Sequence, residues 1–530
     1  MLPMSLPTME PVKDSKPIRR FPAIFPSLRQ VSRVLHPKVL FAWENSVQYR
    51  ASNTSWLDGL RGIAALQVYF FHFFGLHTLW GNPYGATPED VYIHQLPLFR
   101  GIWAAGSAAV CIFFVISGFA ITIKCLTLLR KGQHLACYES LASSLIRRGF
   151  RLYLPVVLVG IPGFFLMRTV DMVEAGTFSF EFERKNSTME QLLDFVHRTD
   201  AHISPFSYAE THEFRDRYPY APSAWTIPME YYGSIVSYLT ILFVSRIPAF
   251  KLRCAVIGFS SLYALHRGCW WASLFLNGML LAEVMLEQRH RAETSEKHAA
   301  PTSRARHIVY QIPFVLMFAF GYYMGGVPPK VLPFDFHPIP RVGYQWLYTL
   351  YPPFWMFEMQ EDTRWLWYWS GMFIIIGISQ VPWLRRVPES TFCQWLGKLS
   401  FSLYLVHPAI IAVLKPHLDR FIDGSGAGKG VKCAFDFITL TPICFIVAAV
   451  TERWIDQPSV TFARWFEKRI TRQETEKSIE LPLGRQLEME EQAPLVERIW
   501  PEEEEGKESS DALLGSPGSS QQRASHDRIS

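Results

Sequence analysis

Charge is scarce in this sequence. Only 19% of the 530 residues are Asp, Glu, Lys or Arg, whereas 49% are hydrophobic and 15% are aromatic. An ordinary soluble protein with long polar ends would carry more charge, so the composition indicates many membrane spans. The formal net charge of +5 is small and spread along the chain, which gives no sign of a nucleic-acid-binding surface.

Paired cysteines are lacking as well. The eight cysteines are scattered singly, and no Cys-x-x-Cys pair occurs. This spacing implies neither a disulfide framework nor a zinc site, and we predict no metal. The glycine-rich stretch Asp423–Gly430 lacks the first glycine and the Ser or Thr of a phosphate-binding P-loop, so we interpret it as a turn between helices.

The two ends of the sequence differ from its centre. Residues 1–55 are polar, basic and rich in proline, so we expect a cytosolic arm and not a cleaved signal peptide. Residues 472–530 turn acidic and then rich in Ser, Gly and Gln, a composition typical of a disordered tail.

Apolar runs fill the centre, several of them short or interrupted by proline. A bilayer crossing takes roughly 20 helical residues. The runs lie at Trp56–Trp80, Ile102–Ile123, Leu152–Met167, Ala224–Val244, Leu252–Leu265, Cys269–Leu286, Ile308–Met324, Trp365–Ile378, Leu399–Leu414 and Cys433–Val450. We therefore predict an all-α polytopic membrane protein with about ten transmembrane helices.

Positive charge in the short loops indicates the orientation. With the basic arm in the cytosol, the predicted loop that holds Arg147, Arg148 and Arg151 also falls in the cytosol. Counting the aromatic run Tyr344–Phe357 as a span would move later basic groups outside, so we interpret it as a lumenal interfacial segment. Both chain ends are then cytosolic. The protein is expected in the membrane of the endoplasmic reticulum or in another endomembrane.

The sequence has two Asn-x-Ser/Thr sequons of interest, and the predicted topology decides which of them can be glycosylated. The loop from Arg168 to Ser223 is predicted to be lumenal, so Asn186 is an expected glycosylation site. Asn53 is expected to remain unmodified because it lies on the cytosolic side.

The first apolar run carries three polar side chains on one helical face. Asp58, Arg61 and His72 follow one another through Ala65 and Tyr69 in steps of three or four residues. Arg61 and His72 are separated by ~16 Å along the axis, which puts the imidazole deep in the membrane. Ionisable residues at that depth usually face a pathway or pocket. The alternative is an Asp58–Arg61 pair that anchors the helix end, with a histidine hydrogen-bonded to a neighbour.

Seven stretches of the sequence carry a further signal. They are LDGLRGIAAL with His72 following, FFVISGFAIT, RRGFRLYLP, SAWTIPMEYYGS, FLNGMLLAE, LGKLSFSLYLVHP and ERWIDQPSV. In this order they resemble the acyltransferase 3 family of multi-pass membrane proteins, in its fungal branch. An acyltransferase-3-like membrane domain is therefore expected over residues 56–466. The one evident departure is Asn277, where the family commonly has an apolar residue.

The resemblance implies transfer of an acyl group, often acetyl, from a coenzyme A thioester on the cytosolic side to a hydroxyl of an acceptor. It also implies essential roles for His72 and for the Arg-x-x-Arg pair, Arg148 and Arg151. The aspartate and arginine of the family's first helix match Asp58 and Arg61.

The residues are compatible with that chemistry. Guanidinium groups bind phosphate bidentately and keep their charge, so Arg148 and Arg151 are suited to hold the phosphorylated head of coenzyme A together with Arg61. The pantetheine arm has a reach comparable to the interval between Arg61 and His72. Burial disfavours an imidazolium, so we expect a neutral His72 that accepts the proton of the attacking hydroxyl.

Three further side chains are supporting candidates. Trp225 and Glu230 lie at the lumenal start of the fourth helix. Glu230 either orients His72 or binds the acceptor, or it is a structural partner for a buried polar group. His407 lies within the ninth helix, where a packed, hydrogen-bonded histidine is favoured over a catalytic one.

Two polar residues are given structural roles at this stage. Ser117, next to Gly118, is expected to let helices approach closely. Asp456, beside Arg453, is expected to form an ion pair at a cytosolic helix end.

The leading function is a membrane-embedded O-acyltransferase for a small lipophilic acceptor such as a fungal secondary metabolite. The partners are then acyl-CoA, the hydroxyl acceptor and the lipid bilayer, with no nucleic acid and an oligomeric state that the sequence does not indicate. Acylation of a glycan or glycolipid is the alternative within this class. A transporter or flippase is the alternative from another class, although the sequence has no convincing inverted repeat.

Overall fold

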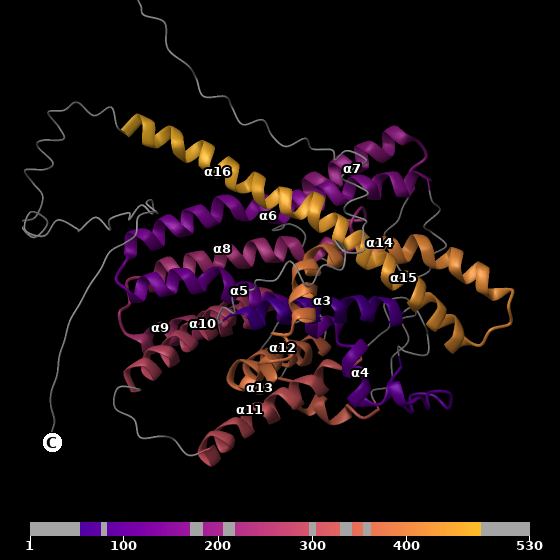
Figure 1. Cartoon of the computed structure of the whole chain (residues 1–530), viewed down its shortest axis with the longest axis horizontal. Coiled ribbons are helices and arrows are strands. Elements are labelled where there is room, and N and C mark those ends of the chain that lie inside the picture. The colour runs from indigo at the N-terminus through magenta and orange to yellow at the C-terminus, as the bar shows by residue number, and fades with distance from the viewer. Residues whose placement is uncertain are drawn as a thin grey trace, which may run out of the picture. The chain divides into compact units, whose positions relative to one another are not determined.

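The computed structural model describes residues 54–75, 82–169, 184–204, 218–295, 304–328, 342–352 and 362–478. Residues 1–53 of the predicted arm and residues 479–530 of the predicted tail lie outside these ranges, whereas residues 472–478, predicted as the start of the disordered tail, are helical. Every regular element in the described part is helical, and fourteen of the elements are α-helices (Figure 1). The predicted all-α class is therefore confirmed.

The described residues of all ten predicted apolar runs fall mainly on helices, and residues 76–80 of the first run lie outside the described ranges. The helices are α3 (Ser55–Gly75), α5 (Gly106–Arg130), α6 (His134–Thr169), α8 (Ile227–Val244), α9 (Phe250–His266), α10 (Trp270–Ser295), α11 (Arg304–Gly325), α12 (Asp362–Gln380), α14 (Thr391–Asp423) and α15 (Lys429–Thr451). Among the described residues, the 6 segments that contain α5, α6, α8, α11, α14 and α15 are long and apolar enough to cross a membrane. The chain is a polytopic membrane protein.

The remaining elements are shorter or more polar. They are η2 (Ile93–Gln95), α4 (Pro97–Trp103), α7 (Thr188–Ile203), η5 (Pro222–Thr226), η6 (Gln345–Leu350), α13 (Pro382–Arg385), the π-helical segment η8 (Glu452–Asp456) and α16 (Gln457–Ser478). The chain divides into two compact units, residues 1–467 and 468–530. The helices that build the site described below lie in the first unit.

The segment predicted as a basic loop before the third span is largely helical, while its cytosolic location stays a prediction. Helix α5 continues to Arg130 and α6 already begins at His134, so Arg148 and Arg151 lie within a helix. The residues before the apolar run are rich in Leu, Ala and Arg, which favour helix formation even where they are polar. As a result, the two arginines have a fixed spacing of one turn along α6.

The predicted lumenal loop also contains a helix. Ser187 accepts a hydrogen bond from the backbone N–H of Glu190, and the Glu190 side chain reaches back to the backbone N–H of Ser187. This capping box satisfies backbone donors at the start of α7. Helix α7 packs against α6.

Helices α3 and α14 approach closely because glycines lie at their contact. A Cβ on Gly62 would collide with the backbone of Leu396 and Gly397, and a Cβ on Gly397 would collide with the backbone of Asp58. Helices α5 and α10 make a similar contact at Gly118 and Gly278. Small residues at a crossing let two membrane helices pack backbone to backbone.

The polar departure at Asn277 is explained by its surroundings. The Asn277 side chain donates to the hydroxyl of Tyr368 at 2.6 Å and accepts from the hydroxyl of Ser261 at 2.9 Å. Its polar atoms are therefore satisfied inside the bundle, where it joins α9, α10 and α12.

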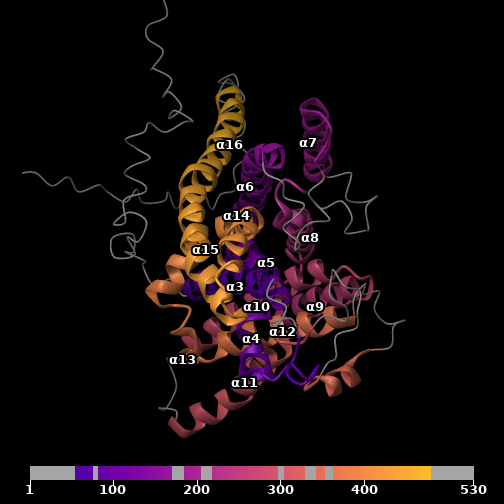
Figure 2. The same cartoon turned by 90° about the vertical axis from the view of Figure 1, so that its right-hand side faces the viewer.

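Helices α5, α6 and α8 lie side by side in both views of the bundle (Figures 1 and 2). Helix α14 also contacts α3, α6 and η5. This arrangement brings together segments that are far apart in sequence, and the candidate site lies where they meet.

Candidate active site

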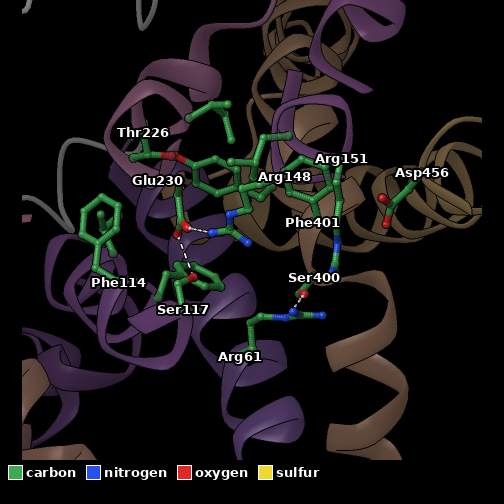
Figure 3. Close-up of a pocket in the computed structure, with 15 residues that line it drawn as sticks. Arg61, Phe114, Ser117, Arg148, Arg151, Thr226, Glu230, Ser400, Phe401 and Asp456 are labelled. Atoms are coloured by element: carbon green, nitrogen blue, oxygen red, sulfur yellow. Dashed lines mark hydrogen bonds and ion pairs between the residues drawn. The ribbon is translucent and has the colours of Figure 1, made fainter. Parts of the chain in front are cut away.

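A cavity of about 120 Å³ lies among α3, α5, α6, η5, α8, α14 and η8 (Figure 3). Its polar lining includes three guanidinium groups and two carboxylates, and its apolar lining is mostly aromatic. The lining residues are Arg61, Val110, Phe113, Phe114, Ser117, Arg148, Arg151, Leu152, Thr226, Ile227, Glu230, Ser400, Phe401, Tyr404 and Asp456. The three predicted coenzyme-binding arginines therefore surround one space.

Glu230 is held at both of its carboxylate oxygens. The Ser117 hydroxyl donates to Oε1 at 3.0 Å, and a guanidinium N–H of Arg148 donates to Oε2 at 2.9 Å (Figure 3). Arg148 also donates from Nε to the Ser234 hydroxyl at 2.8 Å. An ion pair this little exposed, at 12% and 13% of the two side chains, is held in place by such added hydrogen bonds. Glu230 thus contacts Arg148, and His72 has a different partner.

Arg61 enters the cavity from α3. Its Nε donates to the hydroxyl of Ser400 at 3.0 Å and its Nη2 to the carbonyl of Gly397 at 3.2 Å. Both partners lie on α14, and the close α3–α14 packing puts them within reach. The predicted alternative was an Asp58–Arg61 pair. In the structure the Arg61 guanidinium instead donates to these two partners on α14, and Asp58 is exposed at the first turn of α3.

Asp456 lies at the cavity and not at a surface ion pair with Arg453. It is one of the lining residues, and its carboxylate interacts electrostatically with Arg151 and Arg61. The π-helical turn Glu452–Asp456 adds a residue to the helical repeat and thereby changes the direction in which the following side chain points. The sequence predicted a regular helix end here, which would not direct Asp456 toward the cavity.

Tyr404 forms part of the apolar wall. Its hydroxyl is 2.9 Å from the hydroxyl of Thr226, the last residue of η5 and the one directly before α8. The ring of Phe113 packs edge-on against it, with centroids 6.0 Å apart. Tyr404 is also next to His407, whose ring centroid is 6.4 Å away.

His72 and His407 form a pair on facing helices. His72 Nδ1 is 2.8 Å from His407 Nε2, and His407 Nδ1 is 2.8 Å from the carbonyl oxygen of Leu403. His407 is fully buried and His72 is half-buried. The described lining of the cavity includes neither histidine, but Tyr404 of the lining contacts the ring of His407.

The other predicted residues lie apart from this cluster. Trp225 is half-buried in η5, one residue before Thr226 of the cavity lining. Asn186 is exposed just before α7. In the part of the chain that the structure describes, no group of three or more His, Cys, Asp or Glu side chains could hold a metal ion.

Four polar residues of the lining were given no site role by the sequence interpretation. They are Ser117, Thr226, Ser400 and Asp456. All four lie in stretches that carried the family resemblance, so the stretches themselves contained the signal. Their side-chain partners come from other helices and could not be predicted from local spacing.

Comparisons with known proteins agree with this picture. The sequence model of the acyltransferase 3 family, described as an acyltransferase domain, matches residues 54–451. The chain is 26% identical over 452 residues to the O-acetyltransferase PaAT-1 of Phomopsis amygdali, which covers 80% of this chain and 86% of that protein. It is 24% identical over 471 residues to the acyltransferase R4 of a Phoma species, with 77% and 94% covered.

A bacterial relative is similar over a comparable length. A putative O-acetyltransferase of Staphylococcus aureus strain COL is 23% identical over 416 residues, which is 76% of this chain and 56% of that protein. No solved structure matches the chain. Because the family model covers most of the helical bundle, the chain belongs to the acyltransferase 3 family and is an acyltransferase.

Proposed function

We propose that this protein is a membrane-embedded O-acyltransferase that moves an acetyl group from acetyl-CoA to a hydroxyl of a small lipophilic acceptor. The observation that carries the proposal is the cluster of Arg61, Arg148 and Arg151 around one cavity. Tyr404 of the cavity wall also contacts His407, which pairs with His72. Relatives named as an O-acetyltransferase and an acyltransferase support the acetyl group and the oxygen acceptor.

The three guanidinium groups have unequal roles in this proposal. Arg148 is committed to Glu230 and Ser234, so it mainly shapes the cavity. Arg61 and Arg151 supply the charge for the phosphate groups of coenzyme A, because guanidinium binds phosphate bidentately without losing its proton. The donor set therefore fits an anionic head group with an apolar arm.

His72 is proposed as the general base of the transfer. It takes the proton of the acceptor hydroxyl while the oxygen forms a bond to the thioester carbonyl carbon. The carbon–sulfur bond then breaks, and His72 returns the proton to the leaving thiolate. Positioned general base catalysis typically contributes ~10²- to 10⁴-fold in rate.

The acceptor is proposed to be a fungal secondary metabolite. Entry from the lipid phase suits a small lipophilic hydroxyl compound, and the aromatic side chains of Phe113, Phe114 and Tyr404 suit its body. A glycan or glycolipid is the alternative acceptor class.

Membranes from cells that express the protein test the proposal. They are incubated with [¹⁴C]acetyl-CoA and a lipid extract of hydroxylated metabolites, and labelled esters are separated by chromatography. His72→Ala is expected to abolish product while the protein still accumulates in the membrane, and the exposed His134→Ala serves as the matched control.

Two results would contradict the proposal. A His72→Ala variant that retains most of the activity would remove His72 from the mechanism. Uptake of an acceptor into sealed vesicles without any labelled ester would favour a transporter.

A further inference from the structure

The two paired histidines differ in what their ring nitrogens can do. The rings lie 5.0 Å apart between centroids with an interplanar angle of 32°, and the contact runs from His72 Nδ1 to His407 Nε2 at 2.8 Å. A hydrogen bond between two neutral imidazoles requires one nitrogen that carries hydrogen and one that carries a lone pair. The distance alone does not say which ring donates.

The second nitrogen of His407 decides the direction. His407 Nδ1 is 2.8 Å from the carbonyl oxygen of Leu403, one turn earlier on α14. A carbonyl oxygen only accepts, so His407 Nδ1 carries the hydrogen. His407 is fully buried between the rings of Tyr69 and Tyr404, an environment for a neutral ring. Its Nε2 therefore carries a lone pair and accepts.

We infer that His407 is a positioning residue that fixes the hydrogen of His72 on Nδ1 and thereby leaves the basic lone pair of His72 on Nε2. The chain of donors runs from His72 Nδ1 to His407 Nε2 and from His407 Nδ1 to the Leu403 carbonyl. This inference rests on the proposed role of His72 as the base. It goes further because it names the atom that takes the proton and the residue that selects it.

The helix packing makes the selection rigid. His72 lies on α3 and His407 on α14, and these helices meet backbone to backbone at Gly62 and Gly397. Tyr69 packs edge-on against the His407 ring, with centroids 6.1 Å apart, and its hydroxyl is anchored 2.8 Å from that of Thr441. The His407 ring therefore cannot turn without breaking its hydrogen bond to Leu403 and its packing against Tyr69.

The same hydrogen bond serves the reaction in both of its protonation states. When His72 takes the acceptor proton on Nε2, it becomes an imidazolium that still donates from Nδ1 to the lone pair of His407. The pairing therefore holds the ring in one orientation and stabilises the positive charge that forms. A residue that orients a catalytic imidazole in this way can contribute up to ~10⁴-fold in kcat.

Substitutions at position 407 separate this role from packing. Gln places its amide oxygen near the site of the histidine Nε2, so His407→Gln keeps an acceptor for His72. Asn places its amide near the site of Nδ1, so His407→Asn keeps only the bond to Leu403. His407→Leu keeps apolar volume and neither bond. His417→Asn, at an exposed position of the same helix, is the matched control.

The expected result is a loss confined to kcat. His407→Asn and His407→Leu should lower kcat by ~10²-fold or more, as for a base in the wrong tautomer. His407→Gln should remain within about tenfold of the unchanged protein. The KM for acetyl-CoA should change little in all three variants, because none of them touches Arg61 or Arg151. Full activity of His407→Leu would overturn the inference.

A measurement on the unsubstituted protein keeps the inference testable if the variants do not accumulate. Solid-state ¹⁵N spectra of histidine-labelled protein in lipid distinguish the two neutral tautomers, and His72 is assigned by difference from His72→Ala. A neutral His72 protonated on Nδ1 is expected. Protonation on Nε2 would overturn the inference.

The two proposals fail separately. If His72→Ala is inactive and His407→Leu is fully active, the base stands and the positioning role falls. If His72→Ala is active, the base falls, while the nitrogen spectra still report which ring donates.

Discussion

Asp456 contributes one of the two carboxylates that line the cavity. Three guanidinium groups face two carboxylates there, and Asp456 is the carboxylate that interacts with Arg151 and Arg61. Glu230, by contrast, is committed to Arg148 and Ser117. In the proposed function, Asp456 would therefore compete with the coenzyme phosphates for the two arginines.

Removal of this charge should tighten coenzyme binding. Asp456→Asn keeps the shape of the side chain and leaves the guanidiniums of Arg151 and Arg61 with less carboxylate nearby. We expect the KM for acetyl-CoA to fall about threefold, with a steeper dependence on ionic strength because charge contacts are screened by salt. Initial rates at two salt concentrations measure this. A raised KM would instead mean that Asp456 holds Arg151 in place.

At this scale the sequence predicted the cations better than their partners. Arg61, Arg148 and Arg151 were assigned from the family resemblance and from the affinity of guanidinium for phosphate, and all three line the cavity. The role of each remains a prediction. Tyr404 was not identified, because an aromatic residue in an apolar helix is indistinguishable from ordinary core until its neighbours are known.

The crossing of helices α5 and α10 depends on residues that have no side chain at the contact. A Cβ on Gly118 would collide with the backbone of Phe275, which cannot move aside as a flexible side chain can. Gly118→Ala is therefore expected to lower stability by about 1–3 kcal/mol through overpacking.

A second glycine provides the control for this measurement. Gly258 lies within α9, and no atom lies within 4 Å of a Cβ built there. Gly258→Ala should be neutral or stabilising by up to ~1 kcal/mol, since Ala favours helix. Thermal unfolding of both purified variants in the same detergent compares them. Equal unfolding temperatures would show that α5 and α10 can separate at this crossing.

Helix α7 is expected to respond to pH through one histidine. Burial lowers the pKa of His202 from its ordinary value of 6.5 to about 4. Its ring stacks on Tyr218 with centroids 5.0 Å apart. The unfolded segment binds a proton below pH 6.5 that the folded one refuses, so the stabilisation is present above pH 6.5 and is lost as the pH falls towards 4.

Hydrogen exchange of α7 measures this effect. Compared with neutral pH, the free energy of unfolding of α7 should be about 1.4 kcal/mol lower at one pH unit below 6.5. This is a tenfold change in the equilibrium between the closed and the open helix. His202→Phe should remove this pH dependence. An opening equilibrium that is unchanged between pH 7.5 and pH 5.5, after correction for intrinsic exchange, would contradict the lowered pKa.

Element prediction succeeded where the apolar signal was continuous. In the part of the chain that the structure describes, each of the ten apolar runs lies mainly on a helix, because burial in lipid and helix formation favour the same residues there. Helix α7 was predicted as a loop, although Ser187 and Glu190 form a capping box that the sequence already displays. The polar start of α6 was missed because its charge was assigned to a loop.

The whole molecule has a predicted orientation that glycosylation can test. Asn186 is exposed at the start of α7 and is expected to face the lumen. Digestion with an endoglycosidase should increase gel mobility of the full-length protein, and Asn186→Gln should abolish that shift. A shift that depends on Asn53, which lies outside the described residues, would invert the orientation.

At this scale the family and the membrane class followed from the sequence, while the assembly of the site residues around one cavity did not. The motifs are distributed along the sequence, and six of the seven contribute lining residues to one cavity through the packing of α3, α5, α6, α8 and α14. Side-chain partners such as Arg61 with Ser400, which are 339 residues apart in sequence, depend on that packing.

The wide turn before α16 makes the chemistry of the cavity sensitive to chain length. An α-helix rotates by about 100° per residue, so deletion of one residue between Glu452 and Asp456 would restore the regular repeat and swing the acidic group to another face. Such a deletion would leave the hydropathy of the segment nearly intact. In this segment, counting residues therefore matters more than conserving their character.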